Sequence, residues 1–370
     1  MKKRMFYLVI VLMLLVGCGQ AIPSKTAVPP TITAISPTVT VIPTATATPK
    51  LCGVVGTPQA QQQTSYTTQN SAISGNGIRS LYMNVNFILI GHTGDKAGVD
   101  LYTGTTWYHC LSTVIVNDSK VDWAGRLWVA TDGQGVWEYY DGSWRQFQSP
   151  DIDSRTYHIT LDWANQKVFA STWEGVWLFN DGNGTWSQDY VIGKNIFQQH
   201  IDAFAIGSGC MFFGSIIDGG TMSCNNIWNP LSTPKMNLAS AILKLGGDNI
   251  RDIEFQDLNQ QYVWFISDGG KPVTVYDIVD NQWATYSLPN DLDNRGQNID
   301  FDRYGRPWLA TYGGVFYNTS SNGMALGQWI QITSLPSYSI ALGCEGCAFS
   351  DTYVIGTQTS GLLVGKIPPQ

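Results

Sequence analysis

The chain has 370 residues, 14 of them tryptophan, and carries 21 basic against 28 acidic side chains, a net charge of −7. No run of Lys and Arg in the body of the chain would neutralise phosphates, so the composition argues against a nucleic-acid partner. An acidic protein also does not favour anionic lipid headgroups, which leaves a neutral or cationic partner, or one recognised by shape and stacking.

The first 18 residues have the pattern of a lipoprotein signal peptide. Three basic residues at 2–4 precede an uncharged apolar run at 5–16, which is shorter than the roughly 20 residues of a membrane-spanning helix. The run ends in LVGC at 15–18, which resembles a bacterial lipobox. The resemblance implies that residues 1–17 are removed and that Cys18 carries a lipid anchor in the cell envelope, facing the periplasm or the cell exterior. Loss of the three basic residues leaves 18 basic against 28 acidic side chains, a mature charge of about −10.

Residues 18–50 are predicted to form a disordered linker. The stretch 21–50 contains eight Thr and six Pro but no acidic or aromatic residue. Such a segment buries too little apolar surface to fold, and Pro at this density favours an extended, semi-rigid stalk. The stretch is also a candidate for O-glycosylation, although a plain spacer is the simpler interpretation.

A short apolar motif repeats seven times after residue 51. Its instances are spaced 39 to 52 residues apart and end at His92, Thr131, Thr172, Ser215, Ser267, Thr311 and Thr357. Each unit divides into four short strands rich in Val, Ile and aromatic residues, with Gly, Asp and Asn in the turns. Repeats of about 40–50 residues with four strands each predict an all-β fold, a seven-bladed β-propeller of four-stranded antiparallel blades over 51–370.

Tryptophans are expected to mark the packing inside this ring. Trp128 and Trp308 occupy equivalent second-strand positions in blades two and six, where they would pack one blade against the next. A second column lies on the fourth strands, at Trp107, Trp144, Trp186, Trp228, Trp283 and Trp329. Blade seven lacks this position because the chain ends soon after its third strand, so we expect residues 60–72 to supply the missing strand and close the ring.

The pattern D-x-x-G-x-x-W-x-x-T followed by G-(V/L) resembles the two-component regulator propeller repeat. The best matches are blade two, with Asp122, Gly125, Trp128, Thr131 and Gly135, and blade six, with Asp302, Gly305, Trp308, Thr311 and Gly314. The resemblance implies a propeller of the kind found in periplasmic sensor domains and in stand-alone secreted proteins. The repeat is also similar to that of streptogramin-type lyases, but no common catalytic motif accompanies it.

Six cysteines besides Cys18 are an even number, as expected in an oxidising compartment. The C-x-x-C spacing of one pair also permits a redox centre or half of a metal site, but neither a thioredoxin-like helix nor two further ligands accompany it. We therefore predict structural disulfides and neither a metal nor another cofactor. The expected pairs are Cys52–Cys110, Cys210–Cys224 and Cys344–Cys347.

Candidate binding residues lie in the loops between second and third strands. These loops should share one face of the propeller, called the loop face here, with the connections between blades. The predicted rim residues are Asp132, Trp173, Glu174, Asp268 and Tyr312, with Asp95 and Asp218 at corresponding positions. A sugar ring stacks on aromatic side chains and donates hydroxyl hydrogens to carboxylates, so this set suits a glycan. The alternative is that each Asp simply forms a turn.

The histidines suggest a second possible function. All four are assigned to the loop face, and His158 and His200 would flank the channel mouth in neighbouring blades, close to Glu174. Imidazoles beside a carboxylate suit acid–base chemistry. The favoured prediction is nevertheless a membrane-tethered, extracytoplasmic module, not an enzyme, that binds a glycan or a protein. The alternatives are a lyase or hydrolase that uses these three residues, and a structural scaffold of the envelope.

Overall fold

The computed structural model describes a β-rich unit that begins at Leu51. It covers residues 51–54, 56–59, 64–94, 96–189, 200–217, 219–232, 245–247, 249–256, 260–289, 293, 295–343 and 347–370. The signal peptide, Cys18 and the linker lie outside these residues and remain predictions. Within the ranges given, no helix is both long and apolar enough to cross a bilayer.

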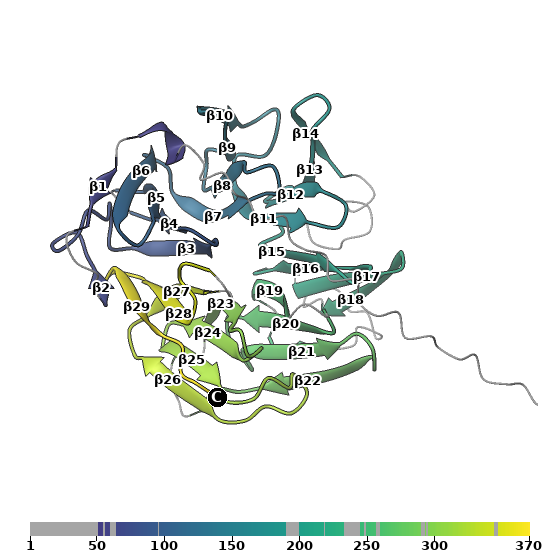
Figure 1. Ribbon diagram of the computed structural model, residues 1–370. Helices are drawn as coiled ribbons and strands as arrows, with labels where there is room; N and C mark the ends of the chain where they lie inside the picture. Colours follow the sequence, from purple (N-terminus) through teal and green to yellow (C-terminus); the bar gives the residue numbers. More distant parts are fainter. Residues whose placement is uncertain are drawn as a thin grey trace, which may run out of the picture. The chain divides into compact units, whose positions relative to one another are not determined.

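Seven antiparallel sheets follow one another around an axis (Figure 1). Blades one to three comprise β3 (Ile78–Met83), β4 (Ile88–His92), β5 (Gly98–Tyr102) and β6 (Thr106–Ser112); β7 (Val116–Val121), β8 (Leu127–Thr131), β9 (Val136–Tyr140) and β10 (Ser143–Phe147); and β11 (Thr156–Asp162), β12 (Lys167–Thr172), β13 (Gly175–Asn180) and β14 (Thr185–Gln188). Blades four and five comprise β15 (Ala203–Gly207), β16 (Cys210–Ser215), β17 (Gly219–Cys224) and β18 (Ile227–Ser232); and β19 (Ile250–Gln256), β20 (Tyr262–Ser267), β21 (Val273–Asp277) and β22 (Gln282–Tyr286). Blade six comprises β23 (Gly296–Phe301), β24 (Pro307–Thr311), β25 (Gly314–Asn318) and β26 (Trp329–Thr333), and blade seven begins with β27 (Ser337–Leu342), β28 (Thr352–Thr357) and β29 (Leu362–Lys366).

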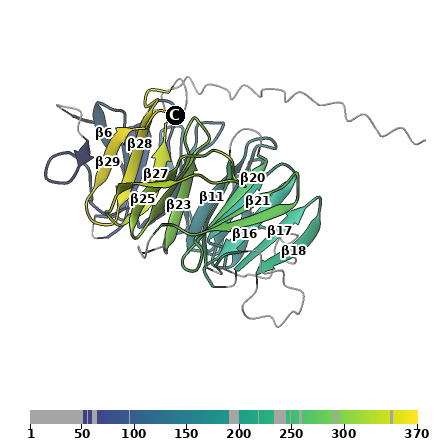
Figure 2. The ribbon, with the colours of Figure 1, turned by 90° about the horizontal axis from the view of Figure 1, so that it is seen from below.

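The first strand of each blade lies nearest the axis. These inner strands contact one another in order from β3 through β27, and β27 contacts β3. Figure 2 shows β11, β23 and β27 at the centre, between the outer strands of the flanking blades. The second strands β4, β8 and β24 are buried along their whole length, because blades pack on both of their faces. The predicted seven-bladed, all-β propeller is confirmed.

Blade seven takes its fourth strand from the beginning of the folded unit. β2 (Ser65–Tyr66) pairs with β29 and places Tyr66 opposite Leu362. Tyr66 is fully buried, and its ring lies 5.3 Å from that of Tyr102 and 5.4 Å from that of Trp107, both in blade one. A further short strand, β1 (Thr57–Pro58), pairs with the outer edge of β6. The segment that precedes β3 therefore joins the last blade to the first.

Two of the expected disulfides are present. Cys52, in the short 3₁₀ turn η1 (Leu51–Gly53), is bonded to Cys110 on β6. Cys210 and Cys224 face each other across the β16–β17 hairpin and are also bonded. Cys347 takes part in a disulfide as well, and its predicted partner, Cys344, lies outside the described residues. Disulfides of this kind are typical of proteins that fold in an oxidising, extracytoplasmic compartment.

The repeat motif is a hydrogen-bonding unit at the turn between the first and second strands. In blade two, Asp122 is buried, and its Oδ1 accepts hydrogen bonds from the backbone N–H groups of Ala124 and Arg126. Its Oδ2 accepts from Arg126 Nε at 2.6 Å and from Trp128 Nε1 at 2.8 Å. Gly125 adopts a φ of +78°, a left-handed conformation that other residues rarely adopt. Blade six repeats the set with Asp302, Gly305, Arg306 and Trp308.

The tryptophan of the motif packs each of these blades onto the next, as expected from the sequence. Trp128 is fully buried, and its ring lies 4.8 Å from that of Phe179 and 5.6 Å from that of Trp186, both in blade three. Trp308 lies 5.3 Å from Tyr353 of blade seven. The motif therefore fixes the turn and the blade interface together, which explains why Asp and Trp occur as a pair.

Candidate functional site

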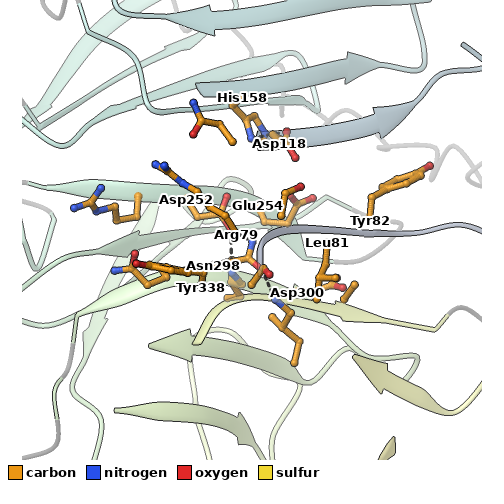
Figure 3. Close-up of a pocket in the computed structure, with 18 of the residues that line it drawn as sticks. Arg79, Leu81, Tyr82, Asp118, His158, Asp252, Glu254, Asn298, Asp300 and Tyr338 are labelled. Atoms are coloured by element: carbon orange, nitrogen blue, oxygen red, sulfur yellow. Dashed lines mark hydrogen bonds and ion pairs between the residues drawn. The ribbon is translucent and has the colours of Figure 1, made fainter. Parts of the chain in front are cut away.

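A cavity of about 450 Å³ lies on the axis and is lined from six of the seven inner strands. Figure 3 shows that Asp118 and His158 lie on one side of it, with Glu254 and Asp252 facing them. The loop face contributes Tyr312 and the side chains at the start of the inner strands. The cavity is therefore the inner part of the channel, entered from the loop face.

A β-bulge in the inner strand helps to bring polar side chains to the axis. In six blades the register between the first two strands shifts after the first paired residue, for example between Val116 and Asp118 and between Ile250 and Asp252. A bulge bends a strand and redirects its side chains. Because side chains alternate along a strand, the residue after the bulge and the residue two positions later share a face. The first set is Ser80, Asp118, His158, Asp252, Asn298 and Ser339; the second is Tyr82, Lys120, Thr160, Glu254, Asp300 and Ala341.

Asp118 and His158 form an ion pair in this channel. His158 Nδ1 lies 3.0 Å from Asp118 Oδ2, and the same carboxylate accepts the backbone N–H groups of Ser119 and Ile159. Burial acts to raise the pKa of Asp118, but the positive charges of His158 and Lys120 and these hydrogen bonds hold it well below its usual range. Burial likewise opposes charging of His158, yet the charge of Asp118 raises the pKa of the imidazole.

Most other carboxyl and amide groups in the channel fasten neighbouring blades together. Asp252 Oδ2 accepts the side-chain amide of Asn298 at 2.7 Å and the backbone N–H of Ile299 at 2.9 Å. Asn298 Oδ1 then accepts the N–H of Ile340, and Asp300 Oδ2 accepts that of Leu342, each at 2.8 Å. These side chains tie blade five to blade six and blade six to blade seven, so their first role is structural.

Glu254 differs from these acids. In the described part of the chain, its carboxyl group makes no hydrogen bond or ion pair, although it lines the cavity. Burial, and next the charges of Asp252 and Asp300, raise the pKa of Glu254 to about 7 against the opposing effect of Lys120. Lys120 Nζ lies 5.7 Å from the centre of the Tyr82 ring. Its pKa is raised, because the surrounding carboxylates outweigh the effect of burial.

A smaller cavity of about 220 Å³ continues the channel toward the opposite face. It shares Tyr82, Lys120, His158 and Glu254 with the first cavity and is otherwise lined mainly by apolar residues from the far ends of β11, β15 and β19. The four shared side chains therefore form the boundary between the two parts of the channel.

Two aromatic groups stand at the mouth. In one, the exposed Trp173 (42% accessible) lies 4.3 Å from the His200 ring, which lies 4.6 Å from Tyr157 at the cavity wall. His200 Nε2 is 3.1 Å from Asp202 Oδ1, close enough for an ion pair but not aligned as a hydrogen bond. Across the mouth, the rings of Tyr312 and Tyr338 are 5.9 Å apart, and both side chains line the cavity.

The predicted rim residues occupy different positions relative to this cavity. Tyr312 lines it, and Trp173 is linked to it through His200. Asp268 does not line it but holds Arg251, which does, through an ion pair of 2.8 Å. Asp132 and Glu174 are exposed and lie outside its wall. Asp95 and Asp218 lie outside the described residues.

The histidines do not gather as the enzymatic alternative expected. Within the described ranges, no hydrogen bond or ion pair joins His158, His200 and Glu174, because His158 pairs with Asp118 and His200 with Asp202. The structure likewise shows, for these ranges, no group of three His, Cys, Asp or Glu side chains arranged to hold a metal ion.

The other two histidines, the buried His92 and the exposed His109, share a buried carboxylate, that of Asp100, in a cluster that sequence reasoning missed. Asp100 accepts hydrogen bonds from His92 Nε2 and His109 Nδ1, each at 2.9 Å, and from the N–H and Oγ–H of Ser74 at 2.7 and 2.6 Å. Burial opposes ionisation, but these partners hold the pKa of Asp100 well below its usual range. Ser74 and Asp100 approach the same ring nitrogen of His109, unlike the members of a catalytic triad. The cluster fastens the segment before β3 to blade one.

Comparison with known proteins shows the fold. No family model matches the sequence, and no curated protein matches it. Among solved structures, the chain is similar to the extracellular domain of the hybrid two-component system BT3049 from B. thetaiotaomicron, with a TM-score of 0.59 and 15% identity, over 80% of this chain and 41% of that one. It thus has the fold of a sensor propeller.

A lyase and a peptide-bound propeller align with this chain at similar TM-scores and sequence identities. A streptogramin B lyase aligns with a TM-score of 0.58 and 14% identity, over 80% of this chain and 95% of the lyase. YCF48 bound to the D1 peptide aligns with a TM-score of 0.55 and 14% identity, over 81% and 95% of the two chains. The disulfides indicate an extracytoplasmic location.

Proposed function

We propose that this chain is a lipid-anchored, extracytoplasmic glycan-binding propeller whose binding site is the mouth of the axial cavity. The observation that carries the proposal is the cavity itself, held between the Trp173–His200–Tyr157 group and the Tyr312–Tyr338 pair. Its volume of about 450 Å³ is in the usual range of small-ligand sites, about 300–1,000 Å³.

The chemistry of the mouth suits a carbohydrate. Sugar rings present C–H groups that pack on aromatic faces, and the indole of Trp173 is 42% exposed, with the Arg155 guanidinium 5.3 Å from its ring centre. Polar side chains of the inner strands beside it, such as Asn117 and Gln297, offer hydrogen bonds to sugar hydroxyls. The anchor at Cys18 and the Thr/Pro-rich linker would hold this site away from the membrane, facing outward.

Related folds support ligand binding as such, without identifying the ligand. Similar propellers include a sensor domain of a two-component system, a virginiamycin B lyase that was solved with quinupristin, and YCF48 with a bound peptide. The catalytic alternative has less support, because His158 and His200 are each engaged with a different Asp. A protein or peptide ligand is therefore the main competing outcome of the test.

The test is binding of the detergent-solubilised, full-length protein to an array of cell-wall and plant glycans. Trp173→Ala is compared with Trp163→Ala, a matched control. Trp163 is 47% exposed and directly follows β11 on the other face, where it lines the smaller cavity and not the cavity at the mouth. We expect binding that Trp173→Ala weakens about tenfold or more and Trp163→Ala leaves unchanged. Absence of glycan binding by the wild type, or equal loss in both variants, would contradict the proposal.

A further inference from the structure

The deep part of the axial channel holds more negative than positive charge. Its carboxyl groups are those of Asp118, Asp252, Glu254 and Asp300, and its basic groups are those of Lys120 and His158; Arg79, Arg251 and Asp202 line the cavity nearer its mouth. The Asp118–His158 ion pair accounts for one charge of each sign, Arg251 is paired with Asp268, and Asp202 lies beside His200. Lys120 and Arg79 are then left to balance three carboxyl groups, which come from the adjacent inner strands β19 and β23.

Only one of these three carboxyl groups is available to a ligand. Asp252 and Asp300 use oxygens to bind backbone N–H groups of the next blade. Glu254 binds no such group within the described ranges, and it lines both parts of the channel. It therefore presents a carboxylate to the cavity without a role in holding the blades together.

Burial is the main reason that the pKa values of Glu254 and Asp300 are raised, each to about 7, and neighbouring carboxylates add a smaller contribution against the opposing charge of Lys120. A cation beside Glu254 would relieve this repulsion and favour the ionised carboxylate. The channel is thus electrostatically prepared for one additional positive charge.

We infer that the ligand carries a free amino group, as in a glucosamine oligosaccharide, and that Glu254 binds its ammonium ion inside the channel. This inference rests on the proposed function, because the aromatic mouth is assigned to the sugar rings. It adds the chemical class of the sugar: a glycan with unmodified amines instead of a neutral or N-acetylated one.

The experiment compares two forms of one oligosaccharide, the glucosamine tetramer and its fully N-acetylated counterpart, by calorimetric titration into the full-length protein in detergent at about pH 7. The wild type should bind the amine form about tenfold more tightly than the acetylated form. Glu254→Gln should remove that preference, because the amine form should lose about tenfold in affinity relative to the acetylated form. Glu254→Asp, which keeps the charge, should keep part of the preference.

A matched control removes a negative charge elsewhere. Asp280→Asn lies in the exposed turn between β21 and β22, away from the cavity lining, and it should leave the preference for the amine form intact. Thermal unfolding of each variant establishes that it is folded. Equal binding of the two tetramers by the wild type, or a preference that survives Glu254→Gln, would overturn this inference while leaving glycan binding in place. Binding of neither tetramer by a protein that binds other glycans would also overturn it, whereas failure on every glycan would overturn the proposed function as well.

Discussion

Replacing Asp122 by Ala should lower the free energy of unfolding by about 3–5 kcal/mol. The carboxylate is 2% exposed and accepts four hydrogen bonds, including those from Arg126 Nε and the Trp128 indole. Its removal takes one of two carboxylates from the buried Arg126 guanidinium, which keeps Asp181, and leaves the indole N–H and two backbone N–H groups without their acceptor. Such a loss is a large part of the roughly 5–15 kcal/mol by which domains are stable.

Asp162→Ala in blade three is the matched control. Among the residues that the structure describes, that buried carboxylate accepts hydrogen bonds only from the backbone and side-chain amide of Asn165 and faces no guanidinium or indole, so its loss should cost about 1 kcal/mol. Urea unfolding followed by tryptophan fluorescence gives the midpoint and slope for each variant. Equal losses in the two variants, or a loss below about 1 kcal/mol for Asp122→Ala, would show that the motif acts only as a turn.

Three other outcomes are expected. Removing the chain before residue 75, and with it β1, β2 and the fully buried Tyr66, should lower the melting temperature by about 10 °C or more; an unchanged value would contradict closure by β2. The pKa of Asp100 is lower in the folded protein than in the unfolded chain. The ionised carboxylate therefore stabilises the fold at pH values above the pKa of the unfolded chain, and this stabilisation is lost as the pH falls through the pKa of the folded protein. Denaturant titrations should therefore show less acid destabilisation for Asp100→Asn than for the wild type. The pKa of Glu254 is raised instead, to about 7, so its ionisation costs stability above that pH. Glu254→Gln should then stabilise the protein by about 2–3 kcal/mol at pH 8 and little at pH 5, and equal effects at both would refute the assignment.

The fold was predictable because its signals are local and repeated. Seven apolar strands at similar spacing, six of which end in Ser or Thr, each report on one blade, as does the Asp–Gly–Trp motif where it occurs, and the ring follows from their number. A substitution in the motif already hides part of the pattern: in blade five Gln256 replaces the Asp and accepts the Trp264 indole at 2.9 Å. Only the structure shows that the two residues are equivalent.

The site was less accessible to sequence reasoning. Tyr312 and Trp173 were predicted because they follow second strands directly. Glu254 was missed because a bulge changes which inner-strand residues face the axis, and no local pattern marks a bulge. His158 was assigned to the mouth, but its partner is Asp118, 40 residues earlier and one blade away. Contacts between blades depend on the closed ring, so they appear only once the ring is assembled.

The disulfide between Cys52 and Cys110 has a mechanical consequence under the proposed anchoring through Cys18. Cys52 precedes β1 and β2, so it is the first fixed point that a pull along the linker would reach. Tension would pass through the covalent bond into β6 and bypass the two-residue strand that closes blade seven. The short strand β2, which closes blade seven, would therefore carry little of the tension. Reduction of the disulfide would transfer the tension to β2 and favour its separation from β29.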